Sequence, residues 1–133
     1  MSGLRVVLAN EPVVYREVIS ATVEIFRPRF EVFTAEPEDL DREFLCLGPR
    51  LVVVCSQLTE LVEREALAWI QLYPNHASHT IVALGDEPPM KLAHMDLDTL
   101  LAVLDTAERL YRREPTPTRA GGYTNSYSQR SPI

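Results

Sequence analysis

The chain has 133 residues, of which 46% are hydrophobic and 24% are charged, the composition of one globular domain rather than of a disordered or fibrous protein. Its apolar runs are too short to cross a bilayer and no secretory leader pattern is present, so we expect a cytoplasmic protein without membrane attachment. Residues 1–110 hold nine basic and eighteen acidic side chains, a charge of −9, whereas residues 111–133 carry +3. An acidic body argues against direct nucleic-acid binding.

The first two segments have the pattern of a buried strand and a helix. Residues 4–10, LRVVLAN, form a continuous β-branched and apolar run, typical of a central strand covered on both faces in a parallel sheet. Pro12 suits the first turn of a helix, and Pro28 prevents that helix from continuing. Apolar residues at helical spacing predict its broad core-facing side: Val14, Val18, Ala21 and Ile25.

An edge strand, a short helix and a third strand are predicted next. FEVFTA at 30–35 alternates apolar and polar residues, which suits an edge position. Leu40, Phe44 and Leu47 keep helical spacing, and the glycine and proline that follow predict the end of this helix. LVVVC at 51–55 forms the third strand.

The following region predicts a longer helix and a fourth strand. Residues 59–73 place Val62, Ala66 and Tyr73 on one helical side, together with Trp69 or Ile70, and this spacing favours core positions over an exposed aromatic patch. TIVALG at 80–85 is the fourth strand. The stretch after it is too short for a helix and a strand, so we expect one small strand there.

A final helix and a tail complete the chain. The helix begins near Asp96, a good N-cap residue. Its apolar stripe comprises Leu97, Leu100 or Leu101, Leu104, Ala107 and Tyr111. Residues 114–133 are rich in Pro, Gly, Ser and Thr, so we expect a domain over 1–113 and a flexible basic tail over 114–133.

Strands and helices alternate, which predicts an α/β fold with a parallel, doubly wound sheet and right-handed crossovers. In such sheets ligands bind beyond the carboxyl ends of the strands, at the point where the strand order reverses. The loops expected to meet there start at Asn10, Cys55 and Gly85.

Three segments resemble the receiver domains of two-component response regulators. RVVLANEPVVYREV resembles that family's first strand, acidic pair and first helix; PRLVVVCSQLTE resembles its third strand and acceptor loop; TIVALGD resembles its fourth strand. The resemblance covers roughly residues 4–110. It implies a flavodoxin-like sheet of four to five strands in the order 2-1-3-4-5, here with a shortened region between the fourth strand and the last helix.

The same resemblance implies a degenerate acceptor pocket. The family's acidic pair corresponds to Asn10 and Glu11, so one carboxylate is replaced by an amide and magnesium affinity should fall. The phosphoacceptor aspartate corresponds to Cys55, with Ser56 next to it, and a thiol cannot form an acyl phosphate. The hydroxyl position after the fourth strand is Gly85. Lys91 lies near the family's lysine position but out of register with it.

Other chemistry has weaker support in the residues. Cys46 and Cys55 read as reduced, apolar residues, and no nucleophile motif surrounds Cys55. His76 and His79 in a loop are only half of a metal site, and His94 has no partner nearby in sequence. No phosphate-binding glycine motif follows a strand. The acidic run at 36–43 suits either a basic partner or the N-terminus of a helix, and the helix interpretation is favoured.

The sequence thus predicts a pseudo-receiver domain that is not an enzyme, needs no metal or cofactor, and acts by protein–protein interaction. A homodimer is the leading prediction, and a signalling or transcription protein is the other expected partner. The interface candidates lie on the last helix: Leu97, Leu100, Leu101, Leu104 and Tyr111. The alternative is a small-molecule or metal site in a crevice lined by Glu11, Cys55 and Ser56, and weak enzymatic activity through Cys55 is a third hypothesis.

Overall fold

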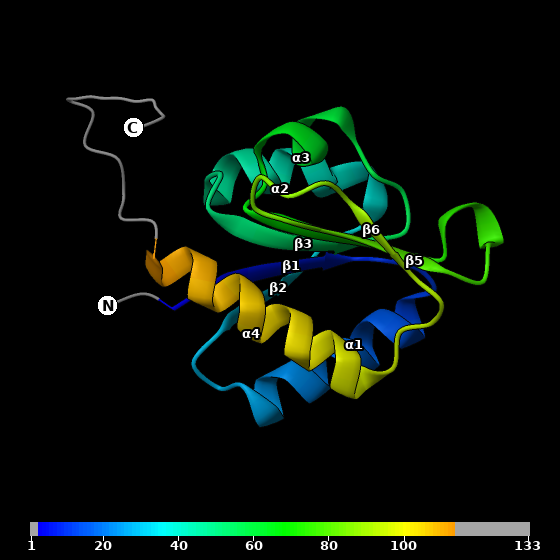
Figure 1. Ribbon diagram of the computed structural model, residues 1–133, viewed down its shortest axis with the longest axis horizontal. Coiled ribbons are helices and arrows are strands. Elements are labelled where there is room, and N and C mark those ends of the chain that lie inside the picture. The colour runs from blue at the N-terminus through cyan, green and yellow to red at the C-terminus, as the bar shows by residue number, and fades with distance from the viewer. Residues whose placement is uncertain (1–2, 114–133) are drawn as a thin grey trace.

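The computed structural model describes residues 3–113, which form a six-stranded mixed sheet with helices on both faces (Figure 1). The strand order is β2-β1-β3-β4-β5-β6. The strands are β1 (Arg5–Ala9), β2 (Glu31–Thr34), β3 (Leu51–Cys55), β4 (Ala68–Leu72), β5 (Thr80–Leu84) and β6 (Met90–Leu92). The helices are α1 (Val13–Phe26), α2 (Leu40–Leu47), α3 (Glu60–Glu65) and α4 (Leu97–Arg113), with single 3-10 turns at Pro37–Asp39 and Pro74–His76.

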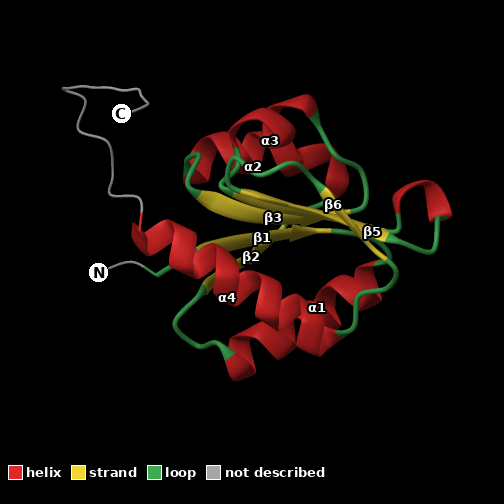
Figure 2. Cartoon of the chain, viewed as in Figure 1, coloured by secondary structure: helices red, strands yellow, loops and turns green. Residues whose placement is uncertain are grey.

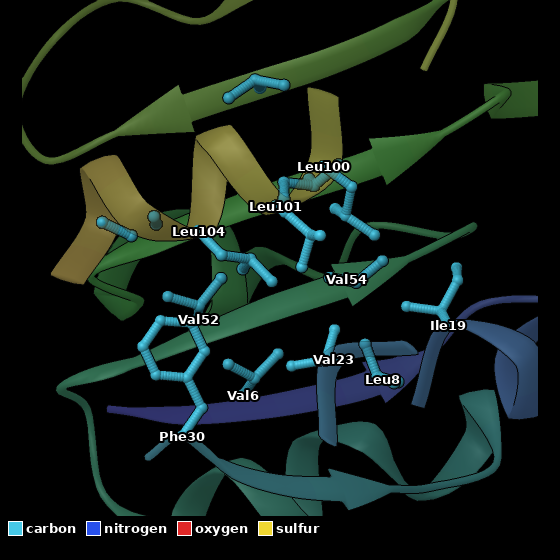
Figure 3. Close-up of a cluster of buried hydrophobic side chains, with 14 of the residues drawn as sticks. Val6, Leu8, Ile19, Val23, Phe30, Val52, Val54, Leu100, Leu101 and Leu104 are labelled. Atoms are coloured by element: carbon cyan, nitrogen blue, oxygen red, sulfur yellow. The ribbon is translucent and has the colours of Figure 1, made fainter. Parts of the chain in front are cut away.

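The helices divide between the two faces of the sheet: α1 and α4 cover one, and α2 and α3 cover the other (Figure 2). Alternate residues of each central strand therefore enter different cores. Val6 and Val52 point toward α1 and α4, where Ile19, Leu100 and neighbouring side chains meet them (Figure 3). All of β1 except Arg5 is buried and β1 lies between β2 and β3, which confirms a central strand covered on both faces. Every residue of β3 is buried as well.

Several local predictions are confirmed. β2 is an edge strand, and a small strand, β6, lies in the short stretch before α4. Helix α2 ends at Leu47 and is capped by Gly48, whose positive φ of 96° is readily adopted only by glycine. At the start of α4 the Asp96 carboxylate accepts a hydrogen bond of 2.8 Å from the Thr99 backbone N–H, as an N-cap does.

The helix predicted over residues 59–73 is wrong in its second half. Helix α3 is capped by Thr59 but ends at Glu65, and Ala68–Leu72 is a strand, β4, between β3 and β5. Ala68 and Ile70 enter the core under α4, whereas Trp69 enters the core under α2 and α3. Pairing on both sides with buried strands outweighs helical spacing in a run this short.

The sheet is consequently not wholly parallel, which corrects the predicted architecture. β2, β1, β3 and β4 run parallel to one another, but β5 runs antiparallel to β4, and β6 runs antiparallel to β5. The β4–β5 connection, residues 73–79, is shorter than the dozen or so residues that a parallel crossover requires. The strand predicted as the fourth is the fifth in chain order, and the sheet has six.

Helix α1 presents the opposite face from the one predicted. Its buried residues are Arg16, Ile19 and Val23, while Val14 is 70% exposed and Val18 46% exposed. The helix is apolar on two sides, so either side could have faced the sheet. The sequence pattern alone did not distinguish them.

The stripe on α4 covers the chain's own sheet. Leu100, Leu101 and Leu104 are buried in the core that α4 shares with α1, and Leu97 and Tyr111 pack partly buried against it. In this fold the three buried leucines are not available to a second molecule.

Two ion pairs connect the loop after α1 to α4. The Arg27 guanidinium binds Asp105 at 2.7 and 2.8 Å, and the Arg29 guanidinium binds Glu108 with two contacts of 2.7 Å. Such two-pronged contacts fix orientation as well as attracting charge. They join segments about 80 residues apart in the chain.

The predicted tail, residues 114–133, lies outside the described residues. Within 3–113, no helix combines the length and apolar character that crossing a bilayer requires.

Candidate functional site

Asn10, Glu11 and Ser56 meet at the carboxyl edge of β1 and β3. These strands pair in parallel with Ala9 opposite Cys55, so the residues that follow each strand are neighbours. The Ser56 hydroxyl accepts a hydrogen bond of 2.9 Å from the Glu11 backbone N–H. The chain leaves β1 through α1 on one face of the sheet and leaves β3 through α3 on the other face, and doubly wound folds bind ligands at such a point.

Cys55 does not line this edge with its side chain. The residue is 1% exposed and packs in the cluster under α2 and α3 with Val53 and Trp69. Burial raises the pKa of its thiol to about 12, because a thiolate would lose its hydration there. The predicted crevice of Glu11, Cys55 and Ser56 is therefore reduced to Glu11 and Ser56. Both cysteines are free, and Cys46 is exposed.

Gly85 and Lys91 are also outside this site. Because β5 runs antiparallel to β4, the carboxyl end of β5 lies beside the amino end of β4. Gly85 follows β5 there, away from Glu11 and Ser56, and its N–H donates to the Leu67 carbonyl at 2.9 Å. Lys91 lies on the edge strand β6, opposite Ile81.

Arg16 is the residue at this edge that sequence reasoning missed. It is 4% exposed; its Nε donates to the Asn10 carbonyl at 3.0 Å and its guanidinium lies 3.2 Å from the Glu36 carboxylate. The only sequence signal for its burial was its position three residues before Ile19 and seven before Val23, which places all three on one side of a helix.

The donor set beside Arg16 is a poor one for a hard dication. The Asn10 side chain is fully buried, and its amide makes no hydrogen bond within residues 3–113. Glu11 is the single carboxylate in the segment between β1 and α1. The buried Arg16 guanidinium donates a hydrogen bond to the backbone carbonyl of Asn10, the residue before Glu11. Mg²⁺ requires several oxygen ligands and is repelled by a nearby positive charge. Among residues 3–113 no group of three or more histidine, cysteine or acidic residues is placed to hold a metal.

A crevice of about 710 Å³ opens beside Glu11 and Ser56, over the ends of β1, β3 and β4. Its wall includes three non-glycine residues in the left-handed region, Tyr73, Asn75 and His76, with φ of 49°, 54° and 64°. Such conformations cost about 1–3 kcal/mol each and concentrate at functional sites. The crevice is lined by Glu11, Pro12, Val13, Ser56, Gln57, Leu72, Tyr73, Asn75 and His76.

The second candidate site is the outer side of α1. Four apolar residues with the spacing 4-3-4 lie exposed along it, and we call them the α1 seam: Val14, Val18, Ala21 and Ile25. Val14 is 70% and Ile25 69% exposed, and Phe26 beside them is 59% exposed. An exposed apolar stripe of this kind makes the outer side of α1 a candidate interaction surface.

In comparisons with known proteins, no family model, no curated protein and no solved structure matches the chain.

Proposed function

We propose that this chain is a receiver-like signalling domain that associates with another protein and does not transfer phosphate. The parallel part of the sheet, with α1 and α2 on opposite faces, supports the receiver-like half of the proposal. The single observation that carries the association half is the exposed α1 seam, because α1 keeps four apolar residues in water although a second apolar side of the helix already covers the sheet.

Phosphotransfer is disfavoured by the residues at the carboxyl edge. Cys55, which the resemblance aligns with the acceptor aspartate, is buried in a closed core that raises the pKa of its thiol to about 12, and a thiol cannot form an acyl phosphate. Ser56 provides no carboxylate. Arg16 adds positive charge beside Asn10, where a metal-dependent receiver needs oxygen ligands for its cation.

The absence of phosphotransfer is testable by intact mass. The full chain is incubated with magnesium and a small acyl-phosphate donor, and its mass is recorded over time. We expect no change. A gain of one phosphoryl group would contradict the proposal, and peptide mapping would then place the modified residue.

Association through the α1 seam is tested with a helical probe peptide. The probe carries leucine along one face and glutamine elsewhere, and fluorescence anisotropy measures its binding to the full chain. Val14→Asp should abolish binding, because a carboxylate in the seam must be desolvated in the complex. The matched control is Leu45→Asp on α2, since Leu45 is also 70% exposed but lies on the other side of the sheet. If the two substitutions weakened binding of the probe equally, the α1 seam would not be its binding site.

A second candidate function is small-molecule binding in the crevice. The observation that favours it is the cavity of about 710 Å³ with left-handed residues in its wall, because ligand sites are concave and largely formed in advance. A fragment library screened by NMR should shift the amide signals of Glu11, Ser56 and His76 together. Shifts scattered over the surface would reject this function, and Cys55→Ala should leave specific shifts unchanged.

A further inference from the structure

The spacing of the α1 seam is that of a coiled-coil contact. A heptad repeat with positions a to g places apolar residues at a and d, which alternate at intervals of three and four. Val18 and Ile25 then take position a, and Val14 and Ala21 take position d. Two β-branched residues at a and a small residue at d leave a shallow strip, two heptads long, on which another helix fits.

The same assignment places two acidic residues along one flank of the strip. Glu17 and Glu24 immediately precede the a positions, so both occupy position g. Both are exposed, and neither has an ion-pair partner among residues 3–113. The single basic residue of α1, Arg16, is buried on the opposite side of the helix. The exposed side of α1 is thus apolar with a purely acidic flank.

A second copy of the chain complements this flank poorly. In an antiparallel pair, position g of one helix faces position g of the other, so the glutamates would face each other. In a parallel pair, g faces e, which is Tyr15 or Thr22 here, and neither supplies a cation. Residues 1–110 also carry −9 overall, so two such bodies repel at long range.

We infer that the α1 seam binds an amphipathic helix of another protein, about two heptads long, whose apolar stripe is flanked by lysine or arginine. This inference rests on the proposed function and specifies the partner's chemistry. Basic residues at the partner's flank pair with Glu17 and Glu24, while its apolar residues cover Val14, Val18 and Ile25. Charges at these positions select the partner in helix pairs of this type.

The test uses three probe peptides with the same leucine face and with lysine, glutamine or glutamate at both flanking positions. The lysine peptide should bind the full chain about tenfold more tightly than the glutamate peptide, as expected for two exposed ion pairs replaced by two repulsions. The difference should shrink as salt is raised from low to physiological concentration and beyond. The double substitution Glu17→Lys with Glu24→Lys should reverse the order of the peptides.

The matched control is Glu63→Lys with Glu87→Lys, which changes the net charge equally at exposed positions away from α1. It should weaken binding of the lysine peptide slightly and leave the order intact. A reversed order in this control would mean that overall charge, not the flank, decides, and would overturn the inference.

The remaining outcomes separate this inference from the proposed function. If all three peptides bind equally and Val14→Asp abolishes binding of each, the seam docks helices but the basic partner is wrong. If none binds, both proposals fail. If sedimentation equilibrium shows a dimer of the wild-type chain that Val14→Asp dissociates, the occupant is a second copy and the inference is overturned.

Discussion

Cys55 and Arg16 each take their properties from surroundings that lie far away in the sequence. Cys55 ends a strand at the position where the resemblance places an acceptor, yet helices α2 and α3 enclose its side chain. Arg16 precedes an exposed glutamate in a helix, yet the ends of β1 and β2 surround its guanidinium. At this scale the chemistry of a residue is determined by what covers it.

The two cysteines should differ sharply toward a thiol reagent. In the native chain near neutral pH we expect one reactive thiol, Cys46, because burial raises the pKa of Cys55 to about 12 and also excludes the reagent. An aromatic disulfide reagent followed by absorbance measures the number, which should rise to two in urea. Cys46→Ser should leave no rapid reaction in the native chain, and a rapid one would show that Cys55 is accessible.

At the scale of elements, α1 and β4 illustrate two different ambiguities. Helix α1 was predicted with nearly its observed bounds but with the wrong side toward the core, because both of its sides are apolar. Strand β4 was predicted as a helix, because five residues fit either period. In both cases the neighbouring strands decide which apolar residues lose contact with water.

The orientation of α1 can be tested with adjacent substitutions. Val18→Asp should change the free energy of unfolding by less than about 0.5 kcal/mol, because Val18 is 46% exposed. Ile19→Asp should cost about 4 kcal/mol or more, since it places a carboxylate in the core next to Val23. Urea unfolding followed by circular dichroism measures both. The reverse ranking would restore the predicted orientation.

At the scale of the whole molecule, the fold closes through contacts that are distant in sequence. Helix α4 crosses the same face as α1 (Figure 1), and the pairs Arg27–Asp105 and Arg29–Glu108 hold it to the loop after α1. These pairs lower the pKa of both carboxyl groups, chiefly through the hydrogen bonds from the two arginines.

This linkage predicts an acid-dependent loss of stability. A carboxyl group whose pKa is lower in the folded than in the unfolded chain stabilises the fold at every pH above its ordinary pKa. The ordinary pKa is 3.8 for Asp105 and 4.5 for Glu108. The stabilisation is lost as the pH falls from these values through the lower pKa values of the folded chain. Arg27→Gln with Arg29→Gln should therefore lower the urea midpoint at pH 7 and have a smaller effect at pH 3.

The control for this measurement is Arg42→Gln, whose side chain is 70% exposed beside Asp39. It should shift the midpoint little at either pH, as expected for an exposed pair. If the double substitution had the same effect at pH 7 and pH 3, the two carboxylates would not be the source of the stabilisation.

The sequence by itself determined the features that depend on local chemistry. Unbroken apolar runs specify β1 and β3, Gly48 ends α2, and Asp96 caps α4, since each effect requires only neighbouring residues. It also placed Asn10, Glu11 and Ser56 together, because residues that follow adjacent parallel strands meet at one edge.

Only the tertiary structure decided the direction of β5 and the buried side of α1, since the sequence pattern allows either choice in both cases. The short connection after β4 makes β5 antiparallel and removes Gly85 from the crevice, and packing against the sheet selects the buried side of α1. The burial of Cys55 and the exposure of the α1 seam follow from that packing. Burial depends on which elements meet, and that is settled only when the whole sheet and its helices close around a common core.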